Sequence, residues 1–65
     1  MQIILNGQSK EITAQNVQAL AAELGMENIA IVAEYNGVIL RKEDWTKTAL
    51  KENDKLELIK FCGGG

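Results

Sequence analysis

A single stripe of apolar residues at helical spacing predicts one short helix and limits the folds that this chain can adopt. Asn16 is suited to cap the start of that helix, and Gly25 suits the left-handed backbone position just past its end. A helix of about two turns is unstable alone in water. It must therefore lie against a sheet made by the rest of the chain. The stripe itself consists of apolar residues at i, i+3, i+4 and i+7, namely Val17, Leu20, Ala21 and Leu24.

Strand patterns occupy the sequence on both sides of the helix. The dipeptides Asn6-Gly7 and Asn36-Gly37 favour tight hairpins, because both positions tolerate positive φ. The element order is β-β-α-β-β-β, so the expected class is α+β, a mixed sheet of four to five strands with one main helix on one face. The predicted strands cover residues 1–5, 8–12, 29–35, 38–40 and 55–61.

Composition within the elements indicates where each one lies. The first and last strands carry the most aliphatic residues and are expected at the centre of the sheet. Lys10 and Glu11 indicate that the second strand is an exposed edge. Residues 45–50 are expected to be irregular, with a short helical turn possible, and Trp45 and Leu50 to close the end of the core. The acidic pairs Glu43-Asp44 and Asn53-Asp54 are interpreted as solvated turn residues.

The sheet face away from the helix receives a second apolar set by strand alternation. One interpretation of this set is a patch that binds a partner. The alternative is scattered surface hydrophobic residues of the ordinary kind. The patch is favoured because two of its members lead directly into the end of the chain. The set consists of Ile4, Val32, Ile59 and Phe61.

The chain ends in three glycines, one residue after the last predicted strand. Glycine costs more backbone entropy to order than other residues and adds no side chain to a core. These glycines are therefore expected to contribute little to the stability of the fold. The alternative is an ordinary loose terminus. We expect a domain over residues 1–61 and a flexible tail over residues 62–65. Cys62 is interpreted as a small hydrophobic residue, with a reactive thiol as the alternative.

Composition excludes several function classes. The 65 residues include no histidine and one cysteine, and no base–nucleophile pair, so neither catalysis by the chain nor a metal site is expected. A net charge of −2 argues against nucleic acid as the main partner. No apolar run suffices for a membrane span, and no basic leader opens the chain. A single cysteine allows no internal disulfide, so a cytoplasmic location is expected.

The terminal Gly64-Gly65 pair and a series of shorter matches point to one known family. The shorter matches are Met1-Gln2-Ile3, Asn36-Gly37, Arg41, Trp45, Thr48-Ala49-Leu50 and Asn53-Asp54. With these features in this order and spacing, the chain resembles the small sulfur-carrier proteins of the ubiquitin-like β-grasp superfamily, and among them the ThiS family of thiamin (thiazole) biosynthesis. Two positions depart from the family pattern: Leu40, where proline is frequent, and Cys62, where an aliphatic residue is usual.

The resemblance implies that the reactive group is the α-carboxylate of Gly65. A ThiF-like (E1-like) adenylating enzyme would activate it with ATP, and a persulfide donor would then supply sulfur to give a thiocarboxylate. A ThiG-like thiazole synthase would receive that sulfur. Cys62, Gly63 and Gly64 would thread the active sites of the partners, and the chain itself would bind no cofactor.

Three other functions stay open from the sequence. The first is a sulfur carrier for molybdopterin synthesis, although the absence of proline favours thiazole formation. The second is a ubiquitin-like modifier that is conjugated through Gly65 to lysines of target proteins. The third is a plain interaction domain whose tail is chemically inert.

Overall fold

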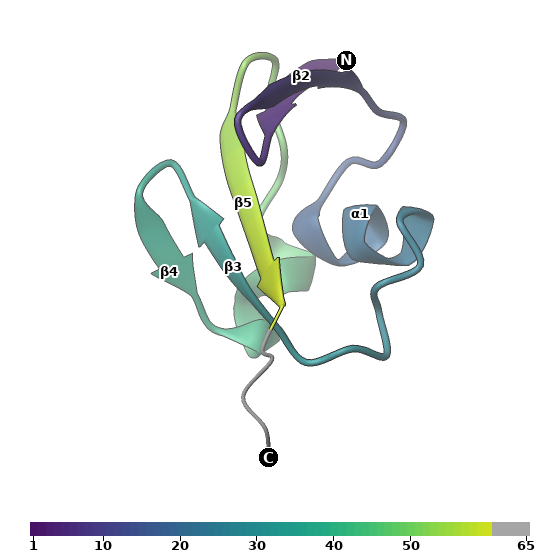
Figure 1. Ribbon diagram of the computed structural model, residues 1–65, viewed down its shortest axis with the longest axis vertical. Coiled ribbons are helices and arrows are strands. Elements are labelled where there is room, and N and C mark those ends of the chain that lie inside the picture. The colour runs from purple at the N-terminus through teal and green to yellow at the C-terminus, as the bar shows by residue number, and fades with distance from the viewer. Residues whose placement is uncertain (61–65) are drawn as a thin grey trace.

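The computed structural model describes residues 1–60, which form a five-stranded mixed sheet with an α-helix on one face (Figure 1). The expected α+β class and element order are confirmed. A 3-10 helix lies between the fourth and fifth strands. The elements are β1 (Gln2–Leu5), β2 (Gln8–Glu11), α1 (Val17–Glu23), β3 (Ile31–Tyr35), β4 (Val38–Leu40), η1 (Lys42–Lys47) and β5 (Lys55–Lys60).

The strand order in the sheet is β2-β1-β5-β3-β4. β1 and β5 run parallel, whereas β1–β2, β3–β5 and β3–β4 are antiparallel. The predicted central position of the first and last strands is confirmed, because β5 occupies the middle and β1 lies beside it. The prediction that the second strand is an exposed edge is also confirmed, since β2 lies at one end of the sheet with all four residues exposed.

The helix has the caps that its sequence predicts. The Asn16 side chain accepts a hydrogen bond from the Ala19 amide at 2.7 Å, and Gly25 adopts a φ of +73°. The start of the helix is also attached to the loop after η1, because the Val17 amide donates to the Thr48 carbonyl at 3.2 Å. These contacts hold a seven-residue helix that would not be stable alone.

The core lies between α1, η1 and the helix-facing side of the sheet. Trp45 is 1% exposed and Leu50 is 6% exposed, which confirms that both belong to the core. The ammonium group of Lys42 lies 5.2 Å from the centre of the Trp45 ring. The remaining buried apolar residues are Ile3, Ile12, Ala14, Val17, Leu20, Ala21, Ala33, Leu56 and Leu58.

Both Asn-Gly turns also hydrogen-bond to the central strand through their asparagine side chains. The backbone φ is positive at Asn6 and Asn36, as at the glycine that follows each, which confirms the predicted conformation. The Asn6 side-chain oxygen accepts from the Leu58 amide at 2.9 Å. The Asn36 side-chain oxygen accepts from the Lys55 amide at 2.8 Å. Each hairpin is thereby attached to β5, one from either side.

The bounds of β1 and β2 each differ from the prediction by one residue, and two other segments differ more. The strand expected from residue 29 begins at Ile31, because Met26 and Ile29 instead close a turn through an amide-to-carbonyl bond of 3.2 Å. Residues 45–50 were expected to be irregular with a short helical turn possible; a helical turn is present as η1, but it begins earlier, at Lys42, and ends at Lys47. A 3-10 helix is short and repeats every three residues. It therefore produces no apolar pattern of α-helical period in the sequence.

Asp54 was expected to be solvated and is instead buried, with 6% of its surface exposed. Its carboxylate accepts hydrogen bonds from the Tyr35 hydroxyl at 2.7 Å, the Lys51 amide at 2.8 Å and the Asn36 side-chain amide at 3.3 Å. Burial raises the pKa of Asp54, but these hydrogen bonds outweigh it and hold the pKa below its usual value. The loop before β5 is therefore fixed to the β3–β4 hairpin by a buried carboxylate.

Candidate functional site

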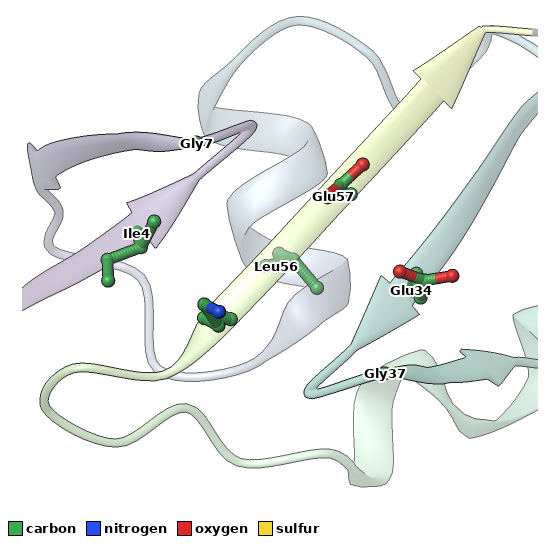
Figure 2. A pocket seen from close by; sticks show the side chains of 7 residues that line it. Ile4, Gly7, Glu34, Gly37, Leu56 and Glu57 are labelled. Carbon is green, nitrogen blue, oxygen red and sulfur yellow. The ribbon is translucent and has the colours of Figure 1, made fainter.

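The sheet face opposite α1 is the candidate docking surface, and we call it the open face. Strand register arranges its side chains in three rows. The first row crosses β3 and β5, the second crosses β4, β3 and β5, and the third crosses β5 and β1. Figure 2 views part of this face, with the helix behind the sheet. The rows are Val32 and Ile59; then Ile39, Glu34 and Glu57; then Lys55 and Ile4.

The structure brings two of the predicted patch residues together. Val32 on β3 lies directly opposite Ile59 on β5, and Ile59 is 49% exposed. Ile4 lies instead opposite Lys55, four residues along β5 from Ile59, which corresponds to about 13 Å of strand. The row that contains Glu57 separates these two apolar positions.

Phe61, the fourth predicted member of the patch, lies outside the described residues. The same holds for Cys62, Gly63, Gly64 and Gly65, and for the tail predicted over residues 62–65. β5 ends at Lys60, whose register partner is Ile31. Residue 61 therefore follows the end of the open face that carries Val32 and Ile59.

The patch predicted from the sequence did not include one exposed apolar residue of this face. Ile39 lies opposite Glu34 and is 66% exposed, more than any other large hydrophobic residue of the described chain. β4 has only three residues, too few for alternation to show which side chain faces which way. The register of the Asn36-Gly37 hairpin was the available signal, because a two-residue turn pairs Tyr35 with Val38 and Glu34 with Ile39.

A hollow of about 290 Å³ lies at the end of the open face between the two hairpin turns. Gly7 and Gly37 line it from the turns, and Ile4, Glu34 and Glu57 line it from the strands (Figure 2). Lys55 and Leu56 complete the lining. It is a mixed surface, with apolar side chains, two carboxylates, one ammonium group and the backbone of the turns. Its shape suits a side chain projecting from another protein more than a buried small molecule, which a pocket would enclose.

The charged groups of the described residues form few ion pairs. The Met1 ammonium lies 2.9 Å from the Glu11 carboxylate, and Arg41 lies 3.4 Å from Glu43. The hydrogen bond to Glu11 raises the pKa of the Met1 ammonium. Within residues 1–60, no three side chains of metal-binding type gather into a metal site. No helix in this part of the chain is long and apolar enough to cross a membrane.

A model of the ThiS family matches residues 3–65 of the chain, which includes both the sheet and the terminal glycines. The chain belongs to the ThiS family. Membership also settles the fold: the five-stranded sheet with its helix is the ubiquitin-like β-grasp of this family. A crystal structure of the thiamine biosynthesis protein ThiS from Geobacter metallireducens superposes with a TM-score of 0.85 at 29% identity, covering 100% of both chains.

Two curated relatives connect the ThiS family to named proteins. The chain is 35% identical over 49 residues to the sulfur carrier protein ThiS of Bacillus subtilis, covering 75% of this chain and 74% of that one. It is also 35% identical over 66 residues to a thiazole synthase of Paramagnetospirillum magneticum. That alignment covers 100% of this chain but 20% of the synthase, so this chain spans about a fifth of that relative's length.

Proposed function

We propose that the chain carries sulfur as a thiocarboxylate on Gly65 and donates it to thiazole formation in thiamin biosynthesis. The observation that carries this proposal is the extent of the family match, which runs to residue 65 and so includes the terminal glycines. The similarity to a sulfur carrier protein of Bacillus subtilis supports the carrier role. The similarity to part of a thiazole synthase supports the choice of a thiazole synthase as the acceptor of the sulfur.

The chemistry follows from the weakness of a carboxylate as an electrophile. The Gly65 carboxylate would attack the α-phosphate of ATP on a ThiF-like adenylating enzyme, releasing pyrophosphate and forming an acyl-adenylate. A persulfide sulfur would then attack the acyl carbon and displace AMP. A thiol would cleave the resulting S–S bond and leave the thiocarboxylate, which would pass its sulfur to a ThiG-like synthase. A terminal glycine suits these steps, since its acyl carbon has no neighbouring Cβ.

In this proposal the chain acts as a substrate of its partners and not as an enzyme. ATP belongs to the adenylating enzyme, and the chain itself holds no cofactor. We propose a cytoplasmic location for the chain and these partners. The domain would orient the tail, converting an encounter between separate molecules into a positioned reaction.

The open face is the surface on which we expect the adenylating enzyme to dock. On the helix side the sheet is largely covered, with Val38 of the edge strand β4 as the exception at 62% exposed, whereas Ile39 and Ile59 project from the open face with 66% and 49% of their surfaces exposed. Exposed apolar groups gathered on one sheet face are typical of a protein interface. β5, which supplies Ile59 to the open face, ends at Lys60, directly before residues 61–65 in the sequence.

The experiment that tests the carrier role is an extension of the chain beyond Gly65. Adding a few residues should abolish sulfur transfer to thiazole synthase while leaving the melting temperature unchanged. The matched control is the same protein after the extension has been cut off to restore the Gly65 terminus, which should regain full transfer. Sulfur transfer by the extended protein would contradict the proposal. Adducts joining Gly65 to lysines of other proteins would instead identify a modifier.

A further inference from the structure

Two carboxylates of the open face lie directly opposite each other. Glu34 on β3 is the register partner of Glu57 on β5. Side chains in such positions have Cβ atoms about 4.5–5.5 Å apart, and like charges there oppose the pairing of the strands. The free protein therefore keeps an unfavourable charge pair in the middle of its exposed sheet face.

The cations nearby do not neutralise this pair. The ion pairs within residues 1–60 join Met1 to Glu11 and Arg41 to Glu43, and neither includes Glu34 or Glu57. Lys55 lies two residues before Glu57 on the same face of β5 and lines the same hollow as both carboxylates, but no ion pair of the described residues joins it to either of them.

Apolar side chains flank the two carboxylates, together with Lys55 in the row of Ile4. Ile39 lies in the same row beyond Glu34, and the row of Val32 and Ile59 lies on the side toward residue 61. Ile4 lines the hollow on the other side. A protein that covers these apolar groups must also remove water from Glu34 and Glu57. Desolvating two carboxylates is costly unless the partner supplies a cation and hydrogen-bond donors.

We propose that the open face docks a protein surface that places an arginine side chain between Glu34 and Glu57, within an apolar contact area. This inference rests on the proposed function, since it specifies the chemistry of the adenylating partner at the docking surface. A guanidinium group is planar and carries five donors, so one group can bond to two carboxylates at once. The hollow of about 290 Å³ beside Ile4 gives room for its aliphatic stem.

The test is a double variant, Glu34→Gln with Glu57→Gln, which keeps the side-chain size and removes both charges. Its affinity for the adenylating enzyme of the same organism is measured by calorimetry at low and high salt. At low salt we expect binding to weaken by at least about 10-fold, and the salt dependence of binding to flatten. The matched control is Glu27→Gln, which removes one charge from an exposed site outside the sheet and should leave affinity unchanged.

The stability of the free protein gives a second readout. Removing the like-charge pair should raise the melting temperature of the double variant by about 2–5 °C, because the repulsion between strands is relieved. A merely structural role for the carboxylates would lower the melting temperature instead. A lower melting temperature together with unchanged affinity would overturn the inference.

A further variant separates this inference from the proposed function. If Ile59→Asp loses binding while the double glutamine variant binds like the natural protein, docking on the open face stands and the arginine is refuted. If Ile59→Asp also binds normally, docking on this face is itself refuted. The cation is identified with enzyme labelled by nitrogen-15 arginine. A guanidinium signal that shifts with the natural chain and not with the double variant supports arginine, and the absence of any such shift overturns it.

Discussion

The two faces of the central strand have opposite characters. Leu56 and Leu58 face the helix and are 0% and 5% exposed, whereas Ile59, which points the other way, is 49% exposed. The same strand therefore supplies the core and the candidate docking surface at alternate residues. Stability and recognition should be separable by substitution, since a change on one face leaves the side chains of the other in place.

The largest effect on stability is expected on the helix side. Leu20→Ala removes a side chain with 0% of its surface exposed, and it should lower the free energy of unfolding by about 2–5 kcal/mol through lost burial and the cavity left behind. Urea denaturation measures this change. Variant protein that is still folded should bind the adenylating enzyme with natural affinity. A negligible change in unfolding would mean that the helix does not hold the core.

Asp54→Asn should have the next largest effect. The Tyr35 hydroxyl and the Lys51 amide donate to one carboxylate oxygen and the Asn36 side-chain amide donates to the other. An amide nitrogen in place of either oxygen therefore faces a donor and cannot accept from it. Leaving such groups unsatisfied should cost about 1–3 kcal/mol. The matched control is Asp44→Asn, which removes a carboxylate outside this network. Equal, small changes in both variants would contradict the role assigned to Asp54.

The same network predicts a pH dependence at both ends of the scale. Because the pKa of Asp54 is lowered in the fold, its stabilisation is present above the ordinary carboxyl pKa of about 4 and is lost as pH falls through the folded pKa. The hydrogen bond to Asp54 raises the pKa of Tyr35. Its stabilisation is present below about pH 10 and is lost as pH rises through the folded value. Urea unfolding at acid, neutral and alkaline pH should show both losses, and Asp54→Asn should reduce both.

The smallest effect on stability is expected on the open face. Ile59→Asp changes a half-exposed side chain of the central strand, so the free energy of unfolding should fall by about 1 kcal/mol through lost burial and lower β propensity. Affinity for the adenylating enzyme should nevertheless fall by at least about 10-fold, because a carboxylate would be buried in an apolar contact. Thermal melting and calorimetry on the same sample measure the two quantities. Equal losses of both would show that Ile59 belongs to the core.

Features set by neighbouring residues were predictable from the sequence. The helix follows from the stripe that contains Leu20, with Asn16 and Gly25 at its ends, and both hairpins follow from the Asn-Gly turns. Burial of Trp45 was predictable from its size. In each case the residues that determine the structure are close together in the sequence, so the pattern is complete within a few positions.

Features set by distant residues were not predictable. The burial of Asp54 depends on Tyr35, 19 positions away, and a polar turn sequence carries no sign of that partner. The pairing of Glu34 with Glu57 requires the register of β3 on β5, which the two strands do not show separately. The open face was therefore predicted as an apolar set containing Ile4 and Ile59, without the carboxylates that lie between them.

The most direct test of the account is the intact mass of the untagged protein made together with its adenylating enzyme, ATP and a sulfur source. The account predicts a mass increase equal to the exchange of one oxygen for sulfur, located at Gly65 by fragmentation. The increase should be absent when the enzyme is inactive. An unchanged mass with active enzyme and sulfur source present would contradict the claim that this domain carries sulfur on its C-terminal glycine.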